Sequence, residues 1–177
     1  MNRLKMRVII WWLRVTRKLR SRGHLLAFKK SGSGVRSALI ILPKGRENAR
    51  IAMYFLKSLP ENNGVKLNFL MDSTLYHFFN GALPQNVFIY SVDDINWFQL
   101  PKKELVERVF AQSYDAVVDM HPSFNLATAY LTYMSNAPFR IGFSGEFSEL
   151  FFNIEIDRKS SEFVEKGYQW IQKLLNL

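Results

Sequence analysis

The first segment with side chains suited to chemistry follows the apolar run 38–42 and contains Lys44, Gly45, Arg46 and Glu47. Two cations beside the start of a predicted helix can hold an anion, because the unpaired N–H groups there carry partial positive charge. One glycine cannot build the G-x-G-x-x-G turn or the P-loop, so nucleotide binding of those kinds is disfavoured. The same residues are equally typical of a solvated turn in which Glu47 stabilises the helix dipole.

A second segment follows the apolar run 116–118 and contains Asp119, His121, Ser123 and Asn125. Asp, His and Ser this close together suggest a hydrolase triad. However, triad partners come from separate loops, and no G-x-S-x-G turn is present to expose the serine. We instead expect Ser123 or Asn125 to cap the following helix. Asp119 is expected to accept N–H groups of its own loop, and His121 is a candidate for contact with a ligand.

A third segment contains Gly142 and Gly145, where a ligand can approach the backbone closely, although loop flexibility explains the two glycines almost as well. Metal chemistry has little support. His24, His77 and His121 lie far apart in the sequence, and no cysteine occurs. We therefore predict no metal ion, no cofactor and no thiol or disulfide chemistry.

Alternating strands and helices are predicted to position these segments. The apolar patterns indicate strands at 38–42, 65–71, 86–92, 115–120 and 139–143, and helices at 47–59, 73–79, 102–112, 125–135 and 160–175. Strands separated by helices of about ten residues indicate right-handed crossovers and a parallel sheet with helices on both faces. We therefore predict one doubly wound, Rossmann-like α/β domain over residues 36–177, with 151–156 as a candidate extra edge strand.

In a doubly wound sheet, ligands bind at the carboxyl ends of the strands, near the point where the strand order reverses. All three segments follow strand ends, so we expect them to lie along one rim. Glu47 is the candidate base on this rim. The candidate substrate-binding residues are Lys44, Gly45, Arg46, His121, Ser123, Asn125 and Gly145.

Charge divides the chain into two parts. The chain has 177 residues, which suits a single domain, and a net charge of +9. Residues 1–36 contain eleven Lys or Arg and no acid, whereas the remainder holds 13 bases against 15 acids. The excess positive charge therefore belongs to an N-terminal arm, predicted over residues 1–30 and joined through a Gly/Ser linker at 31–35.

The arm is predicted to form an amphipathic basic helix over residues 4–19. Its apolar face contains Leu4, Val8, Trp12, Val15 and Leu19. The opposite side carries Arg3, Arg7, Arg14 and Lys18. The longest apolar run of the helix is residues 8–13, which is far short of the ~20 residues that cross a bilayer and lacks the features of a signal peptide.

Two tryptophans beside a cationic face favour peripheral docking on an anionic membrane surface, because an indole ring suits the headgroup boundary. The predicted membrane-binding residues are Trp11, Trp12, Arg7, Arg14 and Lys18, and the expected location is cytoplasmic, on the inner face of the membrane. Alternatively, the helix packs on the domain or on a partner helix. Nucleic-acid binding by the arm is least favoured, because the aromatic side chains lie on a helix rather than on a stacking platform.

Two motifs carry a family resemblance. Residues 114–121 have the sequence YDAVVDMH, and residues 135–143 have the sequence SNAPFRIGF after a predicted helix with small residues at Ala127 and Ala129. Both motifs are similar to the region between the fourth and fifth strands of the ADP-heptose:lipopolysaccharide heptosyltransferase family. The strand at 38–42 and its glycine-containing turn are similar to the first β-α unit of that family. The resemblance covers about Ser37–Ile156.

The resemblance implies the N-terminal, acceptor-side lobe of a two-lobed B-type glycosyltransferase of lipopolysaccharide biosynthesis. In that family the second lobe binds the nucleotide sugar, and an Asp after the glycine of the first loop is the base; Glu47 lies in the corresponding stretch. The expected partners are a glycan or lipid-linked acceptor and a separate nucleotide-sugar-binding lobe. Without that lobe we expect no catalysis by this chain. The alternative is a non-catalytic α/β binding or scaffold module, tethered to the membrane by its arm.

Overall fold

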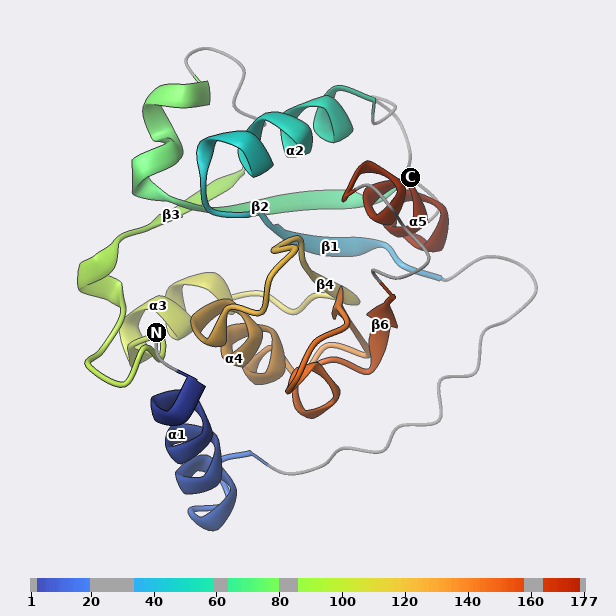
Figure 1. The fold of residues 1–177 in the computed structure, drawn as a ribbon. Coiled ribbons are helices and arrows are strands. Elements are labelled where there is room, and N and C mark those ends of the chain that lie inside the picture. The colour runs from blue at the N-terminus through green and yellow to red at the C-terminus, as the bar shows by residue number, and fades with distance from the viewer. Residues whose placement is uncertain (1–2, 20–33, 59–63, 80–85, 158–163, 176–177) are drawn as a thin grey trace.

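The computed structural model describes residues 3–19, 34–58, 64–79, 86–157 and 164–175, and Figure 1 shows their arrangement. The strands are β1 (Ser37–Ile41), β2 (Lys66–Asp72), β3 (Val87–Tyr90), β4 (Ala116–Asp119), β5 (Phe139–Phe143) and β6 (Ile154–Ile156). The α-helices are α1 (Arg3–Val15), α2 (Arg46–Ser58), α3 (Lys103–Val109), α4 (Leu126–Met134) and α5 (Val164–Leu175). Short 3-10 helices are η1 (Ser73–Phe79), η2 (Val92–Asp94) and η3 (Ser148–Leu150).

The six strands form one parallel sheet in the order β3-β2-β1-β4-β5-β6. From β1 to β3 the chain builds outward on one side, and from β4 to β6 it builds outward on the other. The strand order therefore reverses between β1 and β4, which is the switch point of a doubly wound, Rossmann-like α/β fold. The candidate strand at 151–156 is present as the edge strand β6, which pairs in parallel with β5.

Helices cover both faces of the sheet, with α2 and α5 on one face and α3 and α4 on the other (Figure 1). Neighbouring side chains of β1 alternate between the two faces: Ala38 and Ile40 pack in the cluster with α2 and α5, whereas Leu39 and Ile41 pack in the cluster with α3 and α4. This double burial explains why the first strand is a continuous apolar run rather than an alternating one.

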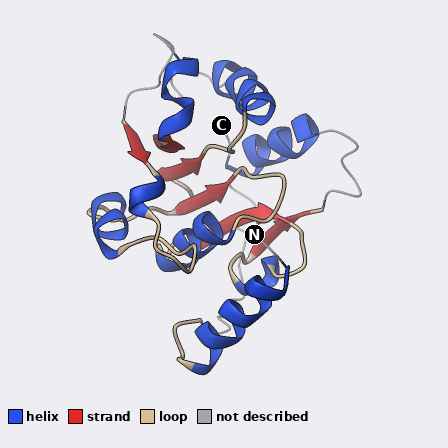
Figure 2. Ribbon diagram, turned by 60° about the vertical axis from the view of Figure 1, so that its left-hand side comes forward, coloured by secondary structure: helices blue, strands red, loops and turns tan. Residues whose placement is uncertain are grey.

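The N-terminal helix α1 lies outside these layers (Figure 2). Ile10, Leu13 and Leu19 are buried in a third apolar cluster, together with Tyr130 of α4 and Phe151 after η3. Of the alternatives for the arm, packing of the helix on the domain is therefore present in the structure. No helix within the described ranges is both long enough and apolar enough to cross a membrane.

Two details differ from the sequence-based expectations. The N-terminal helix ends at Val15 rather than at residue 19, because Arg17 adopts a positive φ of 56° and the N–H of Leu19 donates to the carbonyl of Leu13 at 3.0 Å. The helix expected at 73–79 is a 3-10 helix. Residues 20–30 of the arm and most of the linker at 31–35 lie outside the described residues.

Candidate functional site

The loops that follow β1 and β4 meet at the switch point. The backbone N–H of Lys44 donates to Nε2 of His121 at 3.1 Å. The loop after β5 borders the same region, because a Cβ placed on Gly145 would lie 3.8 Å from Cβ of Phe124. The three segments identified in the sequence therefore lie along one rim of the sheet, as expected from their positions after strand ends.

His121 is buried at the centre of this rim, and the fold engages both of its ring nitrogens. Nε2 accepts the Lys44 N–H, so Nδ1 carries the proton and donates to Oδ1 of Asp119 at 2.7 Å. Oδ1 of Asp119 also accepts the backbone N–H of His121 at 3.1 Å, which confirms the expected role of Asp119 in its loop. The structure gives His121 a bracing role, and its contact with a ligand stays a prediction.

This geometry also explains why Asp119, His121 and Ser123 do not form a triad. In a triad the ring nitrogen remote from the carboxylate faces the serine hydroxyl. Here that nitrogen faces the Lys44 N–H, and Ser123 is exposed at the surface. The helix cap is Asn125, whose side-chain oxygen accepts the N–H groups of the second and third following residues at 3.1 and 3.4 Å.

Sequence inspection missed an ion pair on this rim, between Nζ of Lys44 and Oδ2 of Asp72 at 2.8 Å. Burial raises the pKa of the Asp72 carboxyl, but hydrogen bonds from Lys44 and Thr74 outweigh burial and hold the pKa below its ordinary value of 3.8. Asp72 is the last residue of β2. A polar residue at the end of an apolar strand is the signal that identified Asp119, and the same rule would have found Asp72.

Tyr90, the last residue of β3, lies beneath this ion pair. Nζ of Lys44 is 5.2 Å from the centre of the Tyr90 ring. The Tyr90 hydroxyl is buried and has no hydrogen-bond partner among the described residues. Burial, with the charges of Asp72 and Asp119, raises the pKa of Tyr90, so its hydroxyl stays protonated.

The start of α2 holds the other residues expected on the rim. Gly45 has a positive φ of 91°, a conformation that suits glycine, and its carbonyl accepts the N–H of Ala49 at 2.9 Å to begin the helix. Arg46 and Glu47 are exposed in the first turn, where a carboxylate stabilises the helix dipole. The catalytic role of Glu47 stays a prediction. Within the described ranges, no three His, Asp or Glu side chains come together to hold a metal ion.

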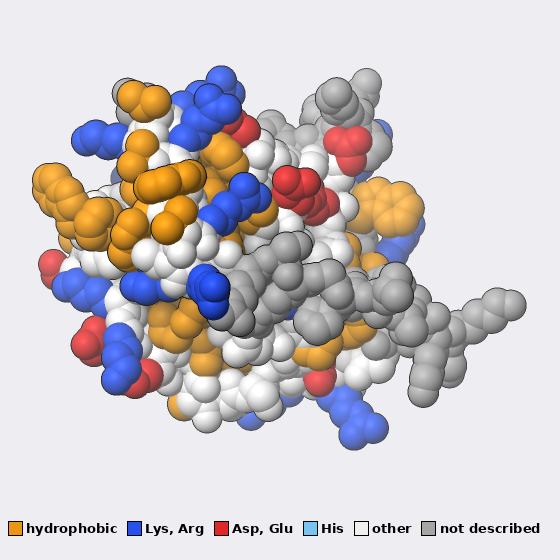
Figure 3. Space-filling view, turned by 90° about the horizontal axis from the view of Figure 1, so that it is seen from below, with side chains coloured by type: hydrophobic (Ala, Val, Ile, Leu, Met, Phe, Trp, Pro, Cys, Tyr) orange, Lys and Arg blue, Asp and Glu red, His pale blue; other side chains and the backbone are white. Residues whose placement is uncertain are grey.

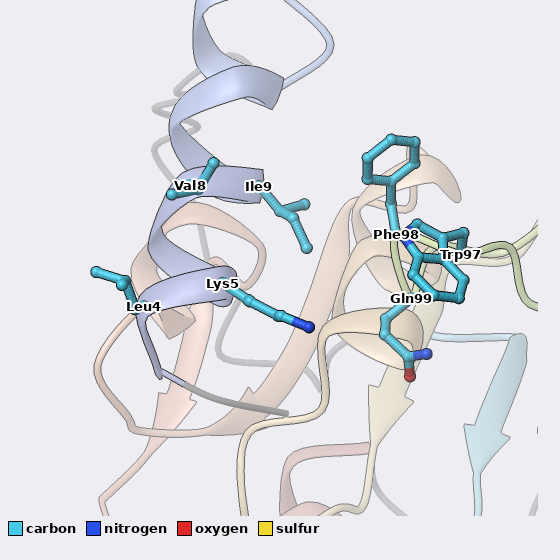
Figure 4. A pocket seen from close by; sticks show the side chains of 7 residues that line it. All are labelled: Leu4, Lys5, Val8, Ile9, Trp97, Phe98 and Gln99. Carbon is cyan, nitrogen blue, oxygen red and sulfur yellow. The ribbon is translucent and has the colours of Figure 1, made fainter.

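A second candidate site is a groove of about 640 Å³ between α1 and the loop after β3 (Figure 4). Lys5 and Ile9 point from α1 toward the loop in Figure 4, whereas Leu4 and Val8 point away from it. The residues that line the groove are Leu4, Lys5, Val8, Ile9, Trp97, Phe98 and Gln99. No residue of this loop was singled out from the sequence.

The helix α1 has two apolar faces. Its buried face contains Ile10 and Leu13 at the core, with Met6 and Ile9 partly buried beside them. A second stripe is exposed and consists of Leu4, Val8, Trp11 and Val15. At about 100° per residue the two sets lie on opposite sides of the helix. The face expected from the sequence to be the apolar one is therefore mostly the side that the fold leaves exposed.

Charged and aromatic contacts hold α1 against the domain. Nε of Arg3 and Nε of Arg7 lie 3.6 and 3.8 Å from the Glu146 carboxylate. Trp12 stacks on Phe98 with ring centres 5.8 Å apart and planes 13° apart. Arg140 lies after α4 in the chain and is buried, and its guanidinium donates to the carbonyls of residues 137 and 151.

Comparison with known families settles the membership of the chain. The model of a family of unknown function, DUF6913, matches residues 17–174. The chain belongs to the DUF6913 family. A comparison with curated protein sequences finds no match for this DUF6913 chain.

Two solved structures show what the DUF6913 chain is similar to in fold. The E. coli heptosyltransferase WaaC with ADP has a TM-score of 0.54 and 16% identity, over 76% of this chain and 46% of that one. The same enzyme with ADP-2-deoxy-2-fluoro heptose has a TM-score of 0.59 and 17% identity, over 78% and 48%. This chain thus spans about half the length of the heptosyltransferase chains. Its fold is that of one lobe of a B-type glycosyltransferase.

We predict that His121→Ala destabilises the domain by about 1 to 3 kcal/mol, because it removes the side-chain partner of the part-buried Lys44 N–H and of the buried Asp119 carboxylate, which keeps only the backbone N–H of residue 121. Urea denaturation at neutral pH measures the change. Ser123→Ala is the matched control, since this neighbouring side chain is exposed, and it should change stability by less than about 0.5 kcal/mol. Wild-type stability of the His121 variant would refute the bracing role.

The lowered pKa of Asp72 predicts that the free energy of unfolding depends on pH. Because its folded pKa lies below 3.8, ionised Asp72 stabilises the fold above pH 3.8, and this contribution is lost as the pH falls below 3.8 toward the folded pKa. Asp72→Asn removes the titration. The difference in unfolding free energy between wild type and variant, from urea denaturation on both sides of pH 3.8, should therefore shrink below that pH. A difference that stays constant with pH would contradict the assignment.

Proposed function

We propose that this chain is a glycosyltransferase-lobe-like domain that docks on an anionic membrane surface through α1 and does not transfer sugar by itself. The observation that supports docking is that α1 has two apolar faces. The stripe of Leu4, Val8, Trp11 and Val15 is exposed, whereas the opposite face packs in the third apolar cluster of the domain. An exposed apolar patch of this kind marks an interaction surface. Figure 3 shows hydrophobic side chains gathered among Lys and Arg on this side of the molecule.

The charges around the stripe favour anionic lipid as the partner. The described residues 3–19, which include α1, contain six Lys or Arg and no acid, and each basic side chain near an anionic membrane contributes about 1 kcal/mol. A second copy of the chain would bring like charges together. Nucleic acid has weaker support, because Trp11 lies on an apolar stripe and not on a stacking platform. We assign the docking to the cytoplasmic leaflet, whose anionic lipids attract basic segments.

The fold supports the rest of the proposal. The fold resembles one lobe of a B-type glycosyltransferase, over about half the length of the heptosyltransferase chains. On its rim, Lys44 is paired with Asp72 and His121 is held by two bonds. We propose that the rim faces a glycan or lipid-linked acceptor, with Glu47 as the base. A separate nucleotide-sugar-binding lobe would complete the site, in a setting such as lipopolysaccharide biosynthesis.

The docking is tested with a triple variant, Leu4→Ser, Val8→Ser and Val15→Ser, which removes the exposed stripe and keeps every charge. Its affinity for vesicles of phosphatidylcholine and phosphatidylglycerol, measured by co-sedimentation, should fall at least about thirtyfold, because binding scales with the apolar area inserted. Wild-type binding should weaken between about 0.1 M and 1 M salt as the charges are screened.

Tyr54→Ser on α2 is the matched control, because Tyr54 is as exposed as the stripe but lies on the other face of the sheet. It should leave vesicle binding unchanged. Thermal melting shows that all variants are folded. Vesicle binding by the triple variant equal to that of the wild type would rule out docking through α1, and tight, salt-resistant binding to duplex DNA would favour nucleic acid instead.

Because this chain spans about half the length of the heptosyltransferase chains, we expect that the 177-residue chain by itself transfers no heptose from ADP-heptose and shows no tight ADP binding by calorimetry. The E. coli heptosyltransferase, which was solved with ADP, is the positive control for both measurements. Turnover by the chain alone would overturn this part of the proposal and require a complete active site within one lobe.

A further inference from the structure

We propose that the loop after β3 is a second membrane-insertion point, at which Trp97 and Phe98 enter the same lipid interface as the exposed stripe of α1. The inference rests on the membrane docking proposed above and adds a contact that fixes the orientation of the domain. Trp97 is 90% exposed and Phe98 is 50% exposed. Two adjacent aromatic side chains at a loop tip contribute little to the core, so their exposure calls for a partner.

The loop is built to hold this tip in place. The side-chain oxygen of Asn96 accepts the backbone N–H groups of Phe98 and Leu100 at 2.9 and 3.1 Å. The N–H of Asn96 donates to the carbonyl of Leu100 at 2.8 Å, and Ile95 pairs with Pro101 in a short antiparallel bridge. These bonds close the backbone beneath the tip. The exposed position of Trp97 is therefore a consequence of a hydrogen-bonded loop.

The tip is coupled to α1. Phe98 stacks on Trp12, and Leu100 is buried in the same cluster as Ile10 and Leu13. The loop and the helix thus form one apolar surface, with the groove of about 640 Å³ between them (Figure 4). Lys5 lies in the wall of this groove, where its ammonium group can meet a lipid phosphate while its stem stays against apolar neighbours.

Charge complementarity favours an anionic lipid surface as the occupant of this groove. The cations come from α1, which contains four Lys or Arg and no acid between Arg3 and Val15, whereas the loop from Asp93 to Glu104 holds two lysines and three acids. Tryptophan is enriched at membrane interfaces, where its ring is buried and its N–H remains hydrated. In a dimer formed through this surface, these cations would lie close to the same cations of the second copy. Their repulsion would oppose self-association.

Two insertion points restrict the orientation of the domain on the membrane more than one helix does. A single helix leaves the domain free to rotate about the helix axis, whereas a helix and a neighbouring loop together set its tilt. The loop after β3 and the rim at Lys44 both follow strand carboxyl ends. The tilt therefore brings that edge of the sheet to the membrane. The acceptor class that this orientation favours is a lipid-linked glycan rather than a soluble sugar.

The test uses full-length single-tryptophan variants. In the first, Trp11, Trp12 and Trp170 are replaced by Phe, which keeps a ring at position 12 for the stacking contact, and Trp97 is the reporter. On vesicles of phosphatidylglycerol and brominated phosphatidylcholine, Trp97 emission should shift to the blue and be quenched. The control variant keeps only Trp170, which is exposed on α5 on the other face of the sheet, and should be neither shifted nor quenched.

A second variant measures the contribution of the tip. Trp97→Ser in the otherwise wild-type chain should weaken vesicle binding at least about tenfold, because the lost side chain removes much of the inserted apolar area. Its thermal melting should be unchanged, since Trp97 is 90% exposed. Vesicle binding with an unquenched Trp97 would overturn the second insertion point and leave α1 docking intact. Absence of vesicle binding by the wild type would overturn both, and a dimer in solution abolished by Trp97→Ser would replace lipid by a second copy.

Discussion

One hydrogen bond at the switch point, from the N–H of Lys44 to Nε2 of His121, sets the arrangement of the candidate rim. Strand order reverses between β1 and β4, so the two loops that follow these strands meet at the sheet edge before they lead to helices on opposite faces of the sheet. Nε2 of His121 accepts the Lys44 N–H, so the ring proton lies on Nδ1. Nδ1 then donates this proton in a hydrogen bond to the Asp119 carboxylate. The carbonyl of Met120, which lies between Asp119 and His121 in the sequence, accepts a hydrogen bond from the Tyr168 hydroxyl. This bond connects the rim to α5.

The residues that carry the family resemblance have structural tasks in this chain. Oδ2 of Asp115 accepts the N–H groups of Arg36 and Ser37 and joins the amino ends of β4 and β1, and these bonds lower its pKa despite partial burial. Arg140 holds two loop carbonyls. Gly142 leaves room for the Phe152 ring, which would lie 2.4 Å from any Cβ at that position. Each of these contacts supports the fold, which is why these residues indicate the glycosyltransferase-lobe fold.

The helix α1 connects the fold to the surface chemistry. Its buried face completes an apolar cluster formed by α4 and by the loops after β3 and β5, while its opposite face stays apolar and exposed. A helix that is apolar on both sides is stable in water only if one side is covered. The domain covers one side, and the proposed membrane docking would cover the other, with the basic residues along the helix facing the anionic lipid.

The sequence alone determined the order of strands and helices, the doubly wound sheet and the rim of three loops, because burial on both faces of a parallel strand leaves a continuous apolar run that local pattern reveals. The sequence alone also showed that the N-terminal arm is basic and that the rest of the chain has slightly more acidic than basic residues. Only the tertiary structure decided which side of α1 is buried, that Glu146 pairs with Arg3 and Arg7, and that Lys44 pairs with Asp72. Periodicity reports that a helix has an apolar face, but contacts between segments distant in sequence choose the partner, and that choice depends on how the whole chain packs.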